Sequence, residues 1–256
     1  MIKKRYLTKY ILDDLNEKMV FVGGPRQVGK TTLASELVSN NFSQFDYFNW
    51  DNRQDRMRML KSEWSGNASL IIFDEIHKYN KWKTFIKGEY DKLKKKYKFI
   101  LTGSARLDIY RKGGDSMQGR YFYYCLHPFT LAELINESKR PDLFKEIVFP
   151  SKFMKDEWLM LDKFGGFPEP IIKQSSRMLR RWHQDKHDRV FRDDIRDVEN
   201  IRDISSIQLL GNLLPERVAS PLSINSIRED LEVSHKAVSR WLNILESFYY
   251  CFRIYP

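Results

Sequence analysis

A glycine-rich segment near the start of the chain has the residues of a phosphate-binding loop. Gly24–Thr31 matches the pattern G-x-x-x-x-G-K-[ST]. Glycines let backbone N–H groups turn toward phosphate oxygens, and the start of a following helix adds a partial positive charge. We expect Lys30 to contact the β and γ phosphates of a nucleotide and Thr31 to bind Mg²⁺. The residues expected around the phosphates are Gly24, Pro25, Arg26, Gln27, Val28, Gly29, Lys30, Thr31 and Thr32.

Two adjacent carboxylates follow an apolar run further along the chain. The run 70–73 leads directly into Asp74 and Glu75. An uninterrupted apolar run is typical of a buried strand in a parallel sheet, and ligands of such sheets lie at the carboxyl ends of the strands. We therefore expect Asp74 to help bind Mg²⁺ and Glu75 to polarise the water that attacks the γ-phosphate. The pair favours hydrolysis over phosphoryl transfer to a small molecule, because a kinase has less need of a water-activating group.

The neighbouring segments predict the elements that would position these residues. An apolar run over 19–24 predicts a strand before the loop, and residues 32–38 predict a helix after it. Strand, glycine loop and helix in this order are the setting in which the loop motif binds phosphate. A further strand is predicted over 97–104, where Thr102 or Ser104 could contact the γ-phosphate or position the water. The alternative for these two residues is ordinary turn chemistry at a strand end.

The chain resembles the AAA+ superfamily, and more closely the prokaryotic AAA-type ATPases that carry a C-terminal domain of unknown function. The segments that carry the resemblance are 24–33, 70–78 and 100–105. Further matches to the subfamily lie at 118–120, 127–134 and 165–169. The resemblance implies an α/β fold, with a P-loop NTPase core of AAA+ type built on a five-stranded parallel sheet. A helical region and a winged-helix-like segment are expected to follow this core.

The resemblance also implies roles for residues outside the two motifs. It makes Ser104 the expected sensor at the end of the fourth strand, with Thr102 second. It makes Arg120 the expected arginine finger, which would complete the site of a neighbouring subunit in a homo-oligomer. Arg106 is the rival, and a structural pairing with an acid is the alternative for Arg120. Nearby candidates for a sensor arginine on the lid are Arg177, Arg180 and Arg181.

Three parts are expected along the chain. Residues 1–128 would form the ATPase core, 129–205 a helical lid or linker region, and 206–256 a winged-helix-like segment. Thr130 followed by Glu133 is a capping-box pattern that opens a helix. Glycines and prolines over 165–170 predict a turn. The final run, 248–256, predicts an apolar strand without a partner, so we expect the last part to be incomplete.

The segment 221–245 has the pattern of a helix-turn-helix. Ile227 and Leu231 mark a short helix, and Val233–Ser234 marks a turn. The core face of a second helix would consist of Ala237, Val238, Trp241, Leu242 and Leu245, and its outward face of His235, Lys236, Ser239 and Arg240. A recognition helix would contact DNA. However, residues 206–256 carry five basic and five acidic side chains, which favours packing or protein binding over DNA.

Positive charge is concentrated in the first half of the chain. Residues 1–128 carry 24 Lys and Arg against 14 Asp and Glu, whereas residues 129–256 carry 20 of each. The difference, 24 − 14, accounts for the whole formal charge of +10. The densest cluster is Lys83, Lys87, Lys92, Lys94, Lys95, Lys96 and Lys98. A solvated helix face and a surface for a nucleic acid or another polyanion both fit this cluster.

Composition excludes several other classes of protein. A mean hydropathy of −0.55 and the lack of a long apolar run argue against a membrane span or a secretory signal. An aromatic fraction of 14% argues against disorder. With only Cys125 and Cys251, a disulfide scaffold and a structural zinc site are not expected. The expected location is the cytoplasm.

The leading hypothesis is a Mg²⁺-dependent protein that binds and hydrolyses ATP and acts as a switch or remodelling ATPase. ATP, ADP and Mg²⁺ are its expected ligands, and a nucleic acid or a protein would be its partner. The alternative is a DNA-binding regulator in which nucleotide state controls the helix-turn-helix. A small-molecule kinase is a third hypothesis, which would consume ATP strongly only with an acceptor present.

Overall fold

The computed structural model describes residues 4–103, 117–135, 154–195 and 204–255. The chain divides into two compact units, Met1–Leu179 and Arg180–Pro256. The expected sensor Ser104 and the rival finger Arg106 lie outside the described residues.

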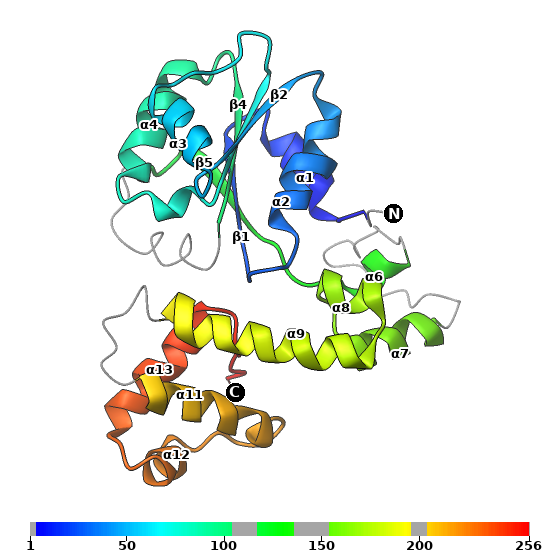
Figure 1. The fold of residues 1–256 in the computed structure, drawn as a ribbon, viewed down its shortest axis with the longest axis vertical. Helices are drawn as coiled ribbons and strands as arrows, with labels where there is room; N and C mark the ends of the chain where they lie inside the picture. The colour runs from blue at the N-terminus through cyan, green and yellow to red at the C-terminus, as the bar shows by residue number, and fades with distance from the viewer. Residues whose placement is uncertain (1–3, 104–116, 136–153, 196–203, 256) are drawn as a thin grey trace. The chain divides into compact units, whose positions relative to one another are not determined.

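The first unit is built on a parallel sheet of five strands in the order β2-β3-β4-β1-β5 (Figure 1). The strands are β1 (Met19–Gly23), β2 (Phe45–Asn49), β3 (Leu70–Asp74), β4 (Lys98–Thr102) and β5 (Tyr121–Cys125). Every residue of β1 and β3 is buried, as expected for strands that are covered on both faces. The predicted α/β fold with a five-stranded parallel sheet is confirmed.

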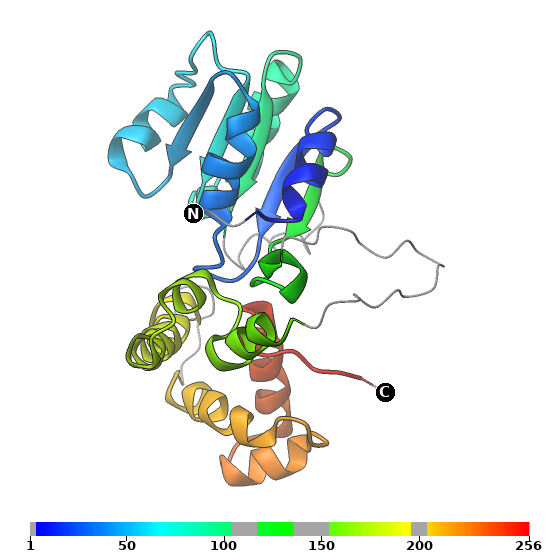
Figure 2. The ribbon, with the colours of Figure 1, turned by 90° about the vertical axis from the view of Figure 1, so that its right-hand side faces the viewer.

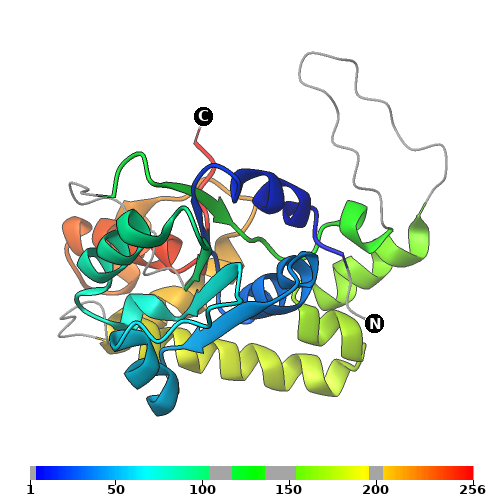
Figure 3. The same cartoon turned by 90° about the horizontal axis from the view of Figure 1, so that it is seen from above.

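Helices cover both faces of this sheet. On one face lie α1 (Leu7–Asp14), α2 (Lys30–Thr32), η1 (Leu33–Val38) and η2 (Ser39–Asn41). On the other lie α3 (Arg53–Leu60), η3 (Ile76–Lys78) and α4 (Trp82–Leu93), and Figures 1 and 3 show the two layers.

Alternating strand residues supply the two cores. In β1, Met19 and Phe21 pack toward α3 and α4, while Val20 and Val22 pack toward α1 and η1. This follows from the period of two along a strand. The predicted helix over 32–38 is present, but Leu33–Val38 is wound as a π-helix rather than an α-helix.

Short helices follow the sheet within the first unit. They are α6 (Leu131–Leu134), α7 (Lys155–Phe164) and α8 (Pro168–Lys173), which lie side by side (Figure 2). Thr130 and Glu133 form the predicted capping box at the start of α6. The turn predicted over 165–170 is shorter than expected, because Pro168 opens α8, a position at which its fixed φ and missing N–H suit a helix.

The second unit is helical in its described residues. Helix α9 (Ser176–Arg189) runs across the boundary and is followed by η4 (Val190–Ile195), α11 (Ile204–Leu213), η5 (Leu214–Arg217), α12 (Ile224–Asp230) and α13 (His235–Ser247). Ser223 and Ser234 cap α12 and α13 by accepting backbone N–H bonds.

The two helices that the helix-turn-helix pattern predicted are present as α12 and α13, although Ala237, predicted in the core, and Ser239, predicted to face outward, are both half-buried. The described core includes Ile227, Val238, Trp241, Leu242 and Leu245, whereas His235, Lys236 and Arg240 are exposed.

The strand predicted at the end of the chain is wrong for the described residues. Residues 251–255 form no strand, and Phe252 and Ile254 are 83% and 87% exposed. A strand needs a neighbour for its backbone hydrogen bonds, and residues 204–255 contain no other strand to supply one. A wing is therefore not among the described elements of this unit.

None of the helices in the described part of the chain has the length and apolar character needed to cross a membrane.

Candidate nucleotide-binding site

The phosphate loop joins β1 to α2 at the carboxyl edge of the sheet, and its backbone requires the two glycines of the motif. Gly24 has a φ of +132°, and a Cβ atom there would lie 2.4 Å from the carbonyl oxygen of Leu126. Gly29 has a φ of +96° in the left-handed region, directly before α2. Glycine adopts both conformations without steric cost, so the loop shape follows directly from the sequence.

Lys30 lies inside the loop rather than in solvent. Its side chain is buried, and Nζ donates hydrogen bonds to the carbonyl oxygens of Gly24 at 3.1 Å and Pro25 at 2.7 Å. Burial lowers the pKa of Lys30 to about 8, while the carboxylates of Glu75 and Asp74 oppose this shift. Phosphate oxygens are stronger acceptors than carbonyls, so a bound nucleotide would compete well for this ammonium group.

Asp74, at the end of β3, is the most heavily hydrogen-bonded carboxylate of the site. Only 2% of the residue is exposed. Its Oδ2 accepts hydrogen bonds from Thr31 Oγ1 at 2.9 Å and from the Tyr47 hydroxyl at 2.6 Å, and its Oδ1 accepts one from Thr102. The structure therefore brings together Thr31 and Asp74, the two residues expected to bind Mg²⁺.

The donor set at Thr31 and Asp74 fits Mg²⁺. A hydroxyl and a carboxylate are the oxygen ligands that this ion prefers, and it usually takes its other ligands from phosphate and water. Among the described residues, no group of three or more His, Cys, Asp and Glu could hold a metal by itself. A cation at this edge would need those further ligands from a nucleotide and solvent. When bound, the cation would neutralise charge on the phosphates.

Glu75 has a different environment from Asp74, although the two are adjacent. Its backbone is left-handed, with a φ of 56°, which is uncommon for a residue other than glycine. Its carboxylate lies 3.4 Å from Lys78 Nζ and 3.7 Å from His77 Nε2. Lys78 also pairs with Asp51, which follows β2. The Glu75 side chain is 23% exposed, so solvent reaches it.

Arg120 is not brought to the phosphate loop of its own chain. It directly precedes β5, at the end of the sheet where the parallel strands begin, and its carbonyl accepts a hydrogen bond from Met19 N. Its Nε and Nη2 donate to the two carboxylate oxygens of Asp91, at 2.8 Å and 3.0 Å. The phosphate loop lies at the opposite edge, so any role of Arg120 at a nucleotide would be at a neighbouring subunit.

A buried ion pair contacts the backbone of the phosphate loop, and sequence reasoning did not identify it. Arg5 Nε lies 2.9 Å from Glu133 Oε1, and both side chains are at least 95% buried. The Arg5 guanidinium also donates to the carbonyl of Val28, within the phosphate loop, at 3.2 Å and to that of His127. It stacks 4.3 Å from the ring centre of Phe129. An arginine in a basic N-terminal segment carries no sequence signal for this role.

The turn between α7 and α8 also packs against the loop. Phe129 N donates to the carbonyl of Gly166 at 2.7 Å, and a Cβ atom on Gly166 would lie 2.4 Å from Phe129 O. Pro168 Cγ lies 3.8 Å from the position that a Cβ atom would take at Gly29. Two of the motifs in the family resemblance, 127–134 and 165–169, therefore meet beside the phosphate loop.

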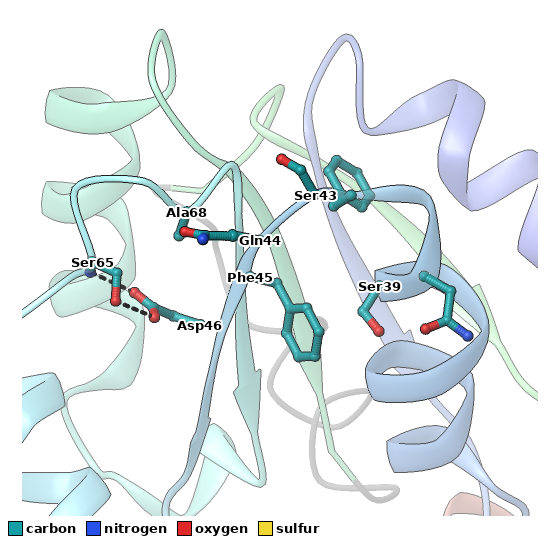
Figure 4. Close-up of a pocket in the computed structure, with 9 residues that line it drawn as sticks. Ser39, Ser43, Gln44, Phe45, Asp46, Ser65 and Ala68 are labelled. Carbon is teal, nitrogen blue, oxygen red and sulfur yellow. Dashed lines mark hydrogen bonds between the residues drawn. The ribbon is translucent and has the colours of Figure 1, made fainter.

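A separate cavity of about 430 Å³ lies away from the loop, at the amino end of β2 (Figure 4). Its only carboxylate, Asp46, accepts hydrogen bonds from the backbone N and the hydroxyl of Ser65 at 2.6 Å and 2.7 Å. These bonds engage both of its oxygens, and the cavity is lined by no other acidic residue. Its lining residues are Ser39, Asn40, Phe42, Ser43, Gln44, Phe45, Asp46, Ser65 and Ala68.

Comparison with known families agrees with this geometry. The sequence profile of an AAA domain matches residues 16–135, and that of a domain of unknown function, DUF8612, matches residues 158–256. The first match spans all five strands and the phosphate loop. The sheet and loop therefore form a P-loop nucleotide-binding fold of the AAA type.

Individual relatives are distant. The chain is 25% identical over 247 residues to the uncharacterized protein MJ1544 of Methanocaldococcus jannaschii. The match takes in 90% of this chain but only 54% of that protein, so the chain spans about half the length of its curated relative.

Among solved structures, the RuvB Holliday junction branch migration motor of Thermotoga maritima is 17% identical, with a TM-score of 0.42 over 95% of this chain and 87% of that one. The ORC1 protein of Aeropyrum pernix, solved in complex with DNA, is 12% identical, with a TM-score of 0.40 over 97% and 84%.

Removal of the Arg5 side chain should strongly destabilise the first unit. Arg5→Ala leaves Glu133 charged and buried, and breaking such a pair costs about 3–5 kcal/mol. Arg120→Ala is the matched control, because it breaks an arginine–carboxylate pair that is open to solvent and should lower stability much less. Urea unfolding of both variants measures the difference, and equal losses would contradict a supporting role for Arg5.

Proposed function

We propose that this chain binds ATP together with Mg²⁺ and hydrolyses it, as a switch or remodelling ATPase of the AAA+ type. One observation carries the proposal. The Thr31 hydroxyl and the Asp74 carboxylate lie 2.9 Å apart beside a loop whose lysine is already turned inward. A loop that served only as a turn would not need a buried lysine and a buried carboxylate at the same edge.

Each side chain has a distinct task in this proposal. Lys30 would exchange its bonds to the loop carbonyls for bonds to the β and γ phosphates. Thr31 and Asp74 would hold the cation, and Glu75 would orient and deprotonate the attacking water. The partial exposure of Glu75 supports hydrolysis over transfer to an acceptor, since water reaches this carboxylate directly.

Assembly into a homo-oligomer is part of the same proposal. Arg120 precedes β5, and five strand residues at roughly 3.3 Å each separate it from the loop end of the sheet. That length exceeds the reach of an arginine side chain. An Arg120 that serves catalysis must therefore act on the nucleotide of a neighbouring subunit.

A DNA-binding regulator is the second candidate. The exposed positions of His235, Lys236 and Arg240 on α13 favour it, because a recognition helix needs outward basic and polar groups. The balanced charge of residues 206–256 favours a protein partner instead. Salt-sensitive DNA binding that is lost in Lys236→Ala would support the regulator.

Substitution of Glu75 should separate turnover from binding. Glu75→Gln should keep the affinity for ATP and slow hydrolysis by about 100-fold or more, because the amide cannot accept the proton from water. Phosphate release and binding of a fluorescent nucleotide, measured on the same samples, test this. Glu63→Gln, at an exposed position of the same unit, should change neither. Hydrolysis by Glu75→Gln at the wild-type rate would remove Glu75 from the proposed reaction.

Two inactive variants should restore activity when they are mixed. Lys30→Ala lacks a working phosphate loop, and Arg120→Ala lacks the finger. A mixed interface can pair an intact finger with an intact loop, so ATP turnover should reappear on mixing. Turnover per chain in the wild type should also rise with protein concentration. If turnover per chain is independent of concentration and mixing restores nothing, Arg120 is a structural partner of Asp91.

A further inference from the structure

Tyr47 contacts the proposed cation site from a strand that carries none of the known motifs. Strand β2 pairs in parallel with β3, so that Tyr47 is opposite Ile72 and Asn49 is opposite Asp74. Residues two apart on a strand share a face, so the Tyr47 and Asp74 side chains project to the same side of the sheet. Tyr47 lies two positions before the residue that pairs with Asp74, and its long side chain spans this distance, so that its hydroxyl lies 2.6 Å from Asp74 Oδ2.

The surroundings of Tyr47 hold this hydroxyl in place. Its ring packs against the apolar core that includes Val28, Leu33 and Ile72, directly below the phosphate loop. Asn49 Nδ2 lies 3.4 Å from the same hydroxyl oxygen and can donate to it. The Tyr47 oxygen accepts this bond through a lone pair, and its own hydrogen is donated to Asp74.

Hydroxyl groups occupy most of the acceptor capacity of Asp74. A carboxylate has about four lone-pair sites. Thr31 and Tyr47 share Oδ2, and Thr102 bonds Oδ1. These donors come from the loop, from β2 and from β4, on three sides of the carboxylate. They fix its plane and leave about one site for a cation or for a water bound to it.

We propose that Tyr47 is a positioning residue for the cation site: its hydroxyl fixes the Asp74 carboxylate in the orientation that serves Mg²⁺. The proposal rests on the function proposed above, since it assumes that Thr31 and Asp74 bind the cation. Groups that orient metal ligands from behind commonly change metal affinity by about 10–100-fold when they are removed. Tyr47 would act only through Asp74 and would not touch the nucleotide.

A purely structural role makes a different prediction. A tyrosine that merely links β2 to β3 would, on losing its hydroxyl, weaken nucleotide binding to the same degree with and without the cation. A positioning residue should change only the part of binding that depends on Mg²⁺. The two roles are therefore separated by measuring binding across a range of cation concentrations.

The test uses Tyr47→Phe, which keeps the ring and removes the hydroxyl. Binding of a fluorescent ADP analogue to the whole chain is measured in EDTA and during a titration with Mg²⁺. The Mg²⁺ concentration for half-maximal enhancement should rise about tenfold or more, with affinity in EDTA unchanged. Tyr97→Phe is the control, because it also removes a phenolic hydroxyl with a hydrogen-bond partner in the same unit. Tyr97 is buried directly before β4, and its hydroxyl donates to Ser65 O at 3.2 Å, away from Asp74.

The outcomes are distinct. A shift in Tyr47→Phe that is absent in Tyr97→Phe, with similar melting temperatures for the two variants, supports the proposal. An unchanged Mg²⁺ requirement, or an equal loss of affinity in EDTA and in Mg²⁺, overturns the role of Tyr47 alone. A wild-type chain whose nucleotide binding does not respond to Mg²⁺ overturns the proposed cation site itself, and the role of Tyr47 with it.

Discussion

The buried carboxylate of Asp74 is the constraint on which the rest of the site depends. A charge that is 2% exposed is costly unless it is hydrogen-bonded, and here hydroxyl groups from three segments meet that need. The strand order makes this arrangement possible, because β3 lies between β2 and β4 and ends beside the phosphate loop. Any other neighbour for β3 would leave Asp74 without Tyr47 or Thr102. The strand order therefore determines which side chains can bond to Asp74.

The phosphate loop has its own supports on the side away from Asp74. Arg5 binds the carbonyl of Val28 and is neutralised by Glu133 on α6, and the turn at Gly166 packs against Phe129. These contacts join the loop to the first residues after the sheet and to the short helices that follow. A movement of the loop on nucleotide binding would therefore first displace α6 and the turn before α8.

Local patterns predicted the parts of the site that are local in the chain. The loop motif and the apolar run before Asp74 predicted that Thr31 and Asp74 lie at the same end of the sheet, and their side chains are hydrogen-bonded there. Tyr47 and Arg5 could not be predicted in this way, because their partners are 27 and 128 residues distant and are brought near only by the strand order and the packing of α6. The terminal strand failed for a related reason: its apolar pattern was present, but pairing depends on a neighbour that the pattern does not specify. The roles of Lys30, Thr31, Asp74, Glu75 and Arg120 remain predictions.

The most direct test of the account is the binding of a non-hydrolysable ATP analogue, measured by calorimetry with and without Mg²⁺. The wild-type chain should give saturable binding that is clearly tighter with Mg²⁺, because in this account Lys30 would hold the phosphates while Thr31 and Asp74 would hold the cation. Lys30→Ala should unfold at a similar temperature and show no measurable binding. Equal binding by Lys30→Ala and the wild type, or wild-type binding that Mg²⁺ leaves unchanged, would contradict the account.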